Sequence, residues 1–172
     1  NEELETSKEE LQSTNEELTV VNQEIVSLNE LVSEARDYAE GIVSTMREPL
    51  LVLDKDLRVK TANNAYYKSF KVNEFDTIGK LIYEVDNEQW NIAELRNLLE
   101  KILPEKSSFN DFEIKNTFTN IGERILILNA RELIKEQSSE KLILLVIEDN
   151  TEIRNKSLEL QLKEKELLKK DL

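Results

Sequence analysis

The chain has 172 residues and a formal net charge of -13, and it contains neither histidine nor cysteine. These two absences exclude disulfides, thiol catalysis, thiolate metal sites and a phosphorylated histidine, and they remove the commonest general base and the usual haem ligand. The acidic charge argues against nucleic acid or an anionic membrane surface as a partner, and no apolar run approaches the ~20 residues that span a bilayer, so we expect a cytoplasmic protein with no membrane insertion.

Residues 1–46 carry a heptad repeat, in which an apolar residue returns every seven positions: Leu4, Leu11, Leu18, Ile25, Val32, Ala39 and Met46. A second column, three residues later, is polar at first and then becomes apolar: Ser7, Thr14, Val21, Leu28, Ala35 and Ile42. This period is typical of a helix that supercoils with a second copy of itself. We therefore predict a parallel homodimeric coiled coil with its seam at Leu4, Leu11, Leu18, Val21, Ile25, Leu28, Val32, Ala35, Ala39 and Ile42.

A second seam is compatible with the same repeat. If Leu4 occupies the other core position of the heptad, the second column of the seam is Lys8, Asn15, Asn22, Asn29, Arg36 and Val43. Three successive buried asparagine layers would lower stability, so the first seam is favoured. The chain begins in mid-heptad without an initiating methionine, which we interpret as a piece of a longer protein.

The helical pattern is expected to end at Pro49, because proline donates no hydrogen bond and disfavours helical geometry in the residue before it. Leu50–Leu53 then has the composition of a short buried strand. Asp54–Asp56 predicts a turn in which aspartate side chains accept hydrogen bonds from nearby backbone N–H groups. Leu57–Thr61 alternates between apolar and polar residues, as expected for the second strand of a hairpin.

Two helical segments follow this hairpin. Asn63 or Asn64 is the expected N-cap of a short helix that runs through Phe70. Between residues 92 and 103, apolar residues at helical spacing predict the longest helix of the middle region, which should end at Pro104.

Three more strands are predicted at Phe109–Phe118, Ile125–Leu133 and Leu142–Asp149, with hairpin turns around Gly122 and between residues 137 and 140. The order of two strands, helices and three antiparallel strands predicts an α+β domain. Its core would be one five-stranded antiparallel sheet with helices on one face. We assign residues 47–150 to this domain.

From Thr151 the pattern is helical again, and residues 151–172 are assigned to an outgoing helix that starts a second coiled coil. Its apolar side chains are Ile153, Leu158, Leu160, Leu162, Leu167, Leu168 and Leu172. Asp149 or Thr151 would cap this helix, and Asp149 with Glu152 has the spacing of a capping box.

Several segments carry a resemblance to a known family: the Asn-Glu-Glu-Leu repeats, Arg47–Asp54, Leu57–Asn63, Gln89-Trp90 and Leu126–Arg131. Together they resemble the PAS region of bacterial hybrids in which chemotaxis-type methylesterase and methyltransferase domains are joined through PAS domains to histidine kinases. The resemblance implies a PAS fold flanked by signalling helices, with the other domains of the parent protein as partners.

The resemblance also implies that Asp149 and Thr151 correspond to the Asp-Ile-Thr signature at the end of the last PAS strand, which couples the sheet to the outgoing helix. Asn150 replaces the usual isoleucine. Both polar anchors are retained, and only the apolar contact between them is altered.

PAS domains can hold haem, flavin or small metabolites between sheet and helices. Because histidine and cysteine are absent, haem bound through histidine and flavin bound through a cysteine adduct are excluded, and we expect no such cofactor. Binding of a non-covalent small ligand stays possible. The candidate cavity residues are Tyr66, Phe70, Tyr83, Trp90 and Asn129. Asn129 enters an otherwise apolar strand and faces either inward, toward a ligand, or outward, because Ile125–Leu128 is apolar on both faces.

The sequence contains no nucleophile–base pair, metal cluster or glycine-rich phosphate loop, so this segment is not expected to be an enzyme. The first hypothesis for its function is a homodimeric PAS sensor that relays a conformational change through its flanking coiled coils. The alternative is a ligand-free dimerisation and spacer module. Enzymatic activity would belong to other domains of the parent protein.

Overall fold

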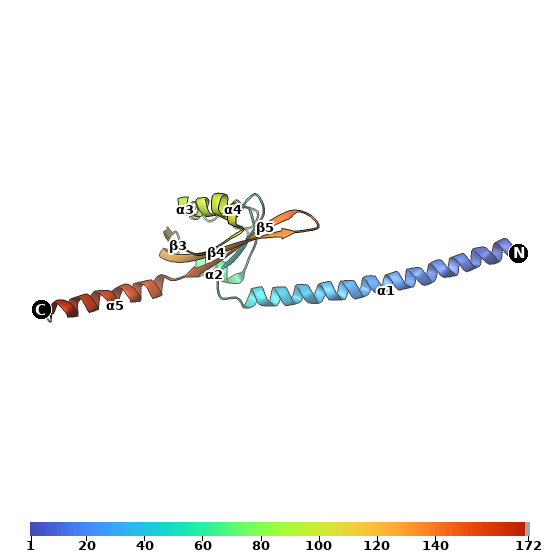
Figure 1. The fold of residues 1–172 in the computed structure, drawn as a ribbon, viewed down its shortest axis with the longest axis horizontal. Helices are drawn as coiled ribbons and strands as arrows, with labels where there is room; N and C mark the ends of the chain where they lie inside the picture. The colour runs from blue at the N-terminus through green and yellow to red at the C-terminus, as the bar shows by residue number, and fades with distance from the viewer. Residues whose placement is uncertain (171–172) are drawn as a thin grey trace. The chain divides into compact units, whose positions relative to one another are not determined.

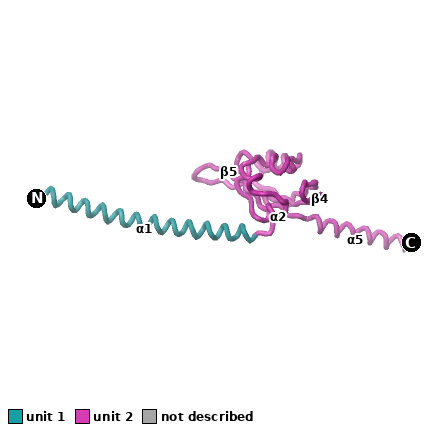
Figure 2. Tube along the Cα trace, turned by 180° about the vertical axis from the view of Figure 1, so that it is seen from behind, with its two compact units in different colours: residues 1–45 teal, residues 46–172 magenta. Residues whose placement is uncertain are grey.

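The structure is a computed structural model that describes residues 1–170 (Figure 1). The chain divides into two compact units, Asn1–Thr45 and the part from Met46 onward, which Figure 2 shows in different colours. The first unit is one helix, α1 (Glu2–Thr45), and the second contains a sheet, several short helices and the outgoing helix α5 (Thr151–Lys170).

Helix α1 is continuous over 44 residues and has no buried side chain. Its heptad residues are largely exposed, with 74% of Leu4, 49% of Ile25 and 59% of Leu28 accessible to solvent. A narrow apolar strip of this kind is typical of a helix that needs a partner. The predicted long helix is confirmed as far as Thr45, whereas its pairing with a second copy stays a prediction.

The five strands form one antiparallel sheet, as predicted, and the structure shows their order to be β2-β1-β5-β4-β3. They are β1 (Leu50–Leu53), β2 (Val59–Ala62), β3 (Ser108–Phe118), β4 (Gly122–Lys135) and β5 (Glu140–Asp149). The register places Leu126 of β4 opposite Asp149 of β5. The end of β5 therefore lies beside the first residues of β4.

The turn between β1 and β2 is stabilised by Asp54, as the sequence predicts. Its Oδ1 accepts the backbone N–H groups of Asp56 and Arg58 at 2.9 and 3.0 Å. The predicted start of the second strand at Leu57 is wrong. Leu57 takes a left-handed backbone conformation (φ 62°) within the turn, so β2 begins only at Val59.

Asn63 caps helix α2 (Asn64–Phe70), which selects one of the two predicted caps. Its Oδ1 accepts the N–H groups of Tyr66 and Leu50 at 3.0 and 2.9 Å, and its Nδ2 donates to the carbonyl of Glu48 at 3.0 Å. Only 4% of Asn63 is exposed. One buried amide thus holds the chain that enters β1 against the start of α2.

The helical segment after residue 92 continues past Pro104, so the predicted end at this proline is wrong. The segment comprises α3 (Ala93–Asn97), the π-helix η1 (Leu98–Ile102) and α4 (Leu103–Lys106). The N–H of Leu103 donates to the carbonyl of Leu98, five residues earlier. Pro104 lies in the first turn of α4, where a missing N–H costs little. The segment ends instead at Ser107, which has a φ of 61°.

One hydrophobic core lies between the sheet and the short helices. Along β5, Ile143, Leu145 and Ile147 are buried, whereas the residues between them are partly exposed. This alternation means that the helices cover one face of the sheet, as predicted. The most deeply buried large side chains are Trp90, Tyr66, Phe70, Phe118, Leu51, Leu53, Ile82, Leu95, Leu98, Leu103, Leu126 and Leu128.

Helix α5 begins at Thr151, directly after β5, and its apolar side chains are exposed, including 62% of Ile153. The predicted capping box is not formed, because Glu152 pairs with Lys156 at 2.6 Å, one turn further along the helix. Leu172, assigned to the apolar stripe, lies outside the described residues. Within residues 1–170, neither α5 nor any other helix has the length and apolar character needed to cross a bilayer.

Candidate functional site

The junction between β5 and α5 is built around Asp149 and Thr151. The Oδ1 of Asp149 accepts the backbone N–H of Thr151 at 3.0 Å and its hydroxyl at 2.5 Å. The same hydroxyl oxygen accepts the N–H of Ile125 in β4 at 2.9 Å. One carboxylate and one hydroxyl therefore connect the last residue of β5, the first residue of α5 and the neighbouring strand.

Two further contacts bind this junction to β4. The N–H of Asn150 donates to the carbonyl of Ile125 at 2.9 Å, and the Nε of Arg124 lies 3.4 Å from the Oδ2 of Asp149. The N–H of Thr151 belongs to the first turn of α5, whose N–H groups have no acceptor within the helix. Asp149 caps that group and places a negative charge at the positive end of the helix dipole.

The first turn of α5 also contacts the edge strand β3. The Nε of Arg154 donates to Oε2 of Glu113 at 2.9 Å, and the terminal NH2 group of Arg154 donates to the same oxygen. Both side chains are about half exposed, 53% for Arg154 and 43% for Glu113. The outgoing helix is thus attached to two different strands.

Four aromatic side chains fill the centre of the core. The ring centroid of Trp90 lies 5.0 Å from those of Phe70 and Phe118 and 6.4 Å from that of Tyr66. None of the four is more than 2% exposed. Three residues that the sequence predicted as cavity walls, Tyr66, Phe70 and Trp90, are therefore brought together and contact one another directly.

A chain of hydrogen bonds leads from this cluster toward the surface. The Nε1 of Trp90 donates to the Oη of Tyr66 at 3.1 Å, and the hydroxyl of Tyr66 donates to Oδ2 of Asp86 at 2.8 Å. Burial raises the pKa of Tyr66 well above its ordinary value, and the charge of Asp86 adds to this effect. Burial also raises the pKa of Asp86, against the opposing effect of the hydrogen bond from Tyr66.

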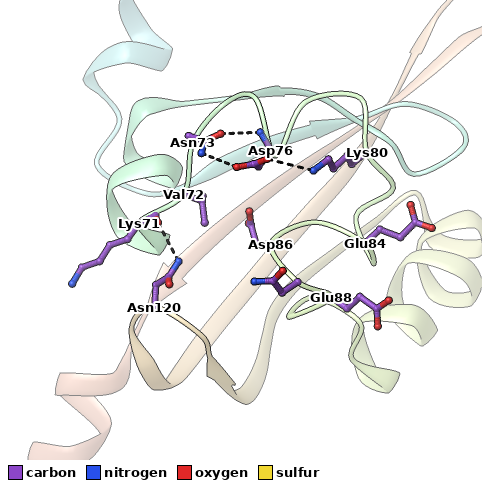
Figure 3. Close-up of a pocket in the computed structure, with 10 residues that line it drawn as sticks. Lys71, Val72, Asn73, Asp76, Lys80, Glu84, Asp86, Glu88 and Asn120 are labelled. Atoms are coloured by element: carbon purple, nitrogen blue, oxygen red, sulfur yellow. Dashed lines mark hydrogen bonds and ion pairs between the residues drawn. The ribbon is translucent and has the colours of Figure 1, made fainter.

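Asp86 lies at a polar pocket of about 550 Å³, shown in Figure 3. The pocket is formed by the loop after α2, the segment 84–88 and the turn between β3 and β4. Its lining residues are Lys71, Val72, Asn73, Asp76, Lys80, Glu84, Asp86, Asn87, Glu88 and Asn120. None of these side chains is aromatic, so the pocket offers charges and amides to a small polar molecule and no surface on which a flavin ring would stack.

The other two predicted cavity residues lie elsewhere. Tyr83 is buried away from the aromatic cluster, with the guanidinium carbon of Arg96 3.9 Å from its ring centroid. Asn129 lies between the buried residues Leu128 and Ala130, so strand alternation turns it to the outer face of the sheet. Its Oδ1 accepts the N–H of Asp111 at 2.9 Å. The inward orientation of Asn129 is therefore wrong, and its amide stabilises a bulge in β3.

Sequence reasoning missed Asp86, Arg124 and the pair Glu113–Arg154. Arg124 could have been found from the register of the β4–β5 hairpin, because this register brings the start of β4 beside Asp149. The pair Glu113–Arg154 joins residues 41 positions apart and leaves no local pattern. Within residues 1–170, no group of three or more acidic side chains is arranged to hold a metal ion. The contacts at the β5–α5 junction and around Asp86 connect structural elements through charged and polar side chains.

Acidification is expected to change the fluorescence of Trp90, the only tryptophan in the chain. The protonation of Asp86 alters the acceptor of the Tyr66 hydroxyl, which is itself bonded to Trp90. Since burial raises the pKa of Asp86, the midpoint should lie above that of an ordinary aspartate. Emission measured against pH checks this midpoint.

The Asp86→Asn variant should lose this transition. Asp76→Asn should retain it with a lower midpoint, because the charge of Asp76 helps to raise the pKa of Asp86. The pKa of Asp86 is raised by folding, so this group makes the folded state lose stability as pH rises through the raised pKa. The free energy of unfolding of Asp86→Asn should lack that decline. An unchanged fluorescence titration in Asp86→Asn would contradict the prediction.

Comparison with known proteins identifies the fold. The sequence profile of the family described as PAS fold matches residues 43–155. No curated protein matches the chain. Among solved structures, the PAS domain of Bordetella pertussis BvgS has 20% sequence identity and a TM-score of 0.54, and the match covers 76% of this chain and 98% of that chain.

Two other solved structures are similar. For the PAS domain of an HTR-like protein from Haloarcula marismortui, the identity is 17%, the TM-score is 0.55, and the match covers 70% of this chain and 96% of that chain. For a PAS domain from a two-component sensor histidine kinase, the identity is 8%, the TM-score is 0.54, and the match covers 69% of this chain and 98% of that chain. These likenesses establish a shared fold.

Proposed function

Because the chain belongs to the PAS-fold family, we propose that it is a homodimeric sensor and signal-relay module of a larger, cytoplasmic bacterial signal-transduction protein. That protein is a histidine kinase or a hybrid with chemotaxis-type methyltransferase domains. The module itself catalyses no reaction. It passes a conformational change through α1 and α5 to the other domains.

The observation that carries this proposal is the junction between β5 and α5. Asn150 alone separates the strand from the helix, and the hydroxyl of Thr151 is bonded to both β5 and β4. A small displacement of the sheet therefore moves the start of α5. Packed elements tend to occupy one of a few discrete arrangements, so such a displacement can be transmitted as a rotation or tilt.

Exposed apolar stripes on the two long helices support the homodimeric part of the proposal. A second copy would cover the heptad columns of α1 along their whole length. The acidic residues on the remaining faces of α1 stay in water. In this arrangement the dimer provides the pair of helices whose relative position changes.

A ligand-free spacer is the second candidate, and the packed aromatic cluster favours it. With Trp90, Tyr66, Phe70 and Phe118 in mutual contact, the centre of the domain is occupied by its own side chains. Such a module would dimerise and hold its neighbours apart without sensing. In the relay proposal, a non-covalent ligand uses the polar pocket at Asp86, and no haem or flavin is bound.

The Asp149→Ala substitution distinguishes relay from spacer. It removes the acceptor of the two hydrogen bonds that Thr151 donates, and it removes the partner of Arg124. The loss of this cap should cost ~1 kcal/mol of stability, so the domain still folds. Output activity of the full-length protein should no longer respond to its stimulus, while denaturant unfolding of the chain shows only the small loss.

Glu152→Ala serves as the matched control, because it also removes a carboxylate from the first turn of α5, but this carboxylate pairs with Lys156 of the same helix. Its output should respond normally. If Asp149→Ala also responds normally, the junction does not carry the signal and the spacer function stands.

A further inference from the structure

Helix α5 is attached to the sheet at two places along its first turn. The first attachment is the junction of Asp149 and Thr151 with β4. The second, three residues beyond Thr151, is the ion pair of Arg154 with Glu113 of β3. A helix held only at its first residue can pivot about that point, whereas a second contact on another strand restricts its direction.

We propose that Arg154 and Glu113 form a latch that favours one direction in which α5 leaves the sheet and makes that direction depend on the position of β3. This inference rests on the relay function proposed above and names the contact that sets the helix direction. Two N–H groups of one guanidinium bond the same carboxylate oxygen. Charge-assisted bonds from a planar guanidinium are directional, so the pair orients the helix as well as attracting it.

Strand β3 is suited to this role because its C-terminal part and the turn that follows it are bonded to the segment that carries the pocket and Trp90. The Nδ2 of Asn116 donates to the carbonyl of Gln89 at 2.9 Å, and the N–H of Thr119 donates to the Oε1 of Gln89 at 3.1 Å. Gln89 is 8% exposed. A shift of the segment next to Asp86 thus displaces β3, and Glu113 carries that displacement to Arg154.

The strength of the latch fits a reversible contact. An exposed ion pair contributes little to stability, since its charges are well solvated and screened by salt. The latched and open positions of α5 then differ only a few-fold in population. A small change at β3 is sufficient to shift the balance between them.

Distance measurement between two spin labels tests the latch. The chain has no cysteine, so Asn97→Cys on α3 and Glu164→Cys on α5, both at exposed positions, create two unique labelling sites. Labelled protein is diluted into an excess of unlabelled protein, so that only distances within one protomer are recorded. Glu113→Gln and Arg154→Gln should each raise the ratio of the population outside the main distance to the population at that distance by about two- to five-fold.

The charge-swapped double variant, Glu113→Arg with Arg154→Glu, should restore the narrow distribution. Glu152→Gln is the matched control, because it breaks an exposed pair of the same helix that does not reach the sheet. Unchanged distributions in both single variants, or a double variant as broad as either single, would overturn the latch. The distance measurement reports on one protomer, so it tests the latch independently of dimerisation. If the latch is confirmed but the chain sediments as a monomer, the dimeric relay is refuted and the latch stands.

Discussion

Substitution of Ile25 and Leu28 by aspartate is expected to convert the protein from a dimer into a monomer. In the favoured seam both residues occupy core positions, and both are substantially exposed in the single chain, 49% and 59%. Two charges in each helix would be buried opposite identical charges of the second copy, without a compensating partner. The mass measured by sedimentation equilibrium or native mass spectrometry should fall from twice the 20.0 kDa of one chain to that value.

The matched control places the same charges on the outer face of α1. Gln23→Asp with Ser27→Asp lies outside both possible seams and should leave the dimer intact. Asn22→Ile then distinguishes the two registers: it strengthens the dimer if Asn22 is a core position and has little effect if Asn22 flanks the seam. A wild-type chain that sediments as a monomer at micromolar concentration would remove the basis of the homodimeric function.

The second large effect is expected from Trp90→Ala, which should lower the free energy of unfolding by about 3–5 kcal/mol. Trp90 is fully buried and contacts three other rings. Its removal leaves a cavity that these neighbours fill only in part. Urea unfolding that is monitored through hydrogen exchange of the sheet amides measures this loss of unfolding free energy without a contribution from α1.

Trp90→Phe is the milder variant, because it keeps one aromatic ring and loses the second ring of the indole together with the bond from Nε1 to Tyr66. Its cost should be smaller, about 1–2 kcal/mol. A loss below that range for Trp90→Ala would contradict the packed core. It would mean that the space around this side chain is already hydrated, and a ligand between sheet and helices would regain support.

Apolar periodicity and turn residues were sufficient to predict the sheet, the long helix α1 and the start of α5. These signals are local: the cap at Asn63, the turn at Asp54 and the strand-to-helix transition at Thr151 each depend on a few neighbouring residues. The errors at Leu57 and Pro104 have a common cause. In both places a backbone conformation, left-handed at Leu57 and π-helical before Pro104, overrides the usual preference of the side chain.

The candidate site was only partly predictable, because its contacts join distant segments. Asp149 and Thr151 were found since they flank a visible boundary between strand and helix. The orientation of Asn129 was undecided because Ile125–Leu128 is apolar on both faces, and only the pairing of β4 with its neighbours resolves it. Glutamate and arginine are common on protein surfaces, and no pattern in the sequence relates Glu113 to Arg154.

The bulge in β3 also bears on how the protein behaves in concentrated solution. An edge strand exposes unpaired N–H and C=O groups on which a strand of another molecule can add, which leads to aggregation. In β3 the N–H of Asp111 is already committed to Asn129, and its φ of 56° interrupts the straight run of the strand. The charged side chains of Glu113 and Lys115 lie two and four residues further along the strand. The sheet thus resists uncontrolled growth at this edge.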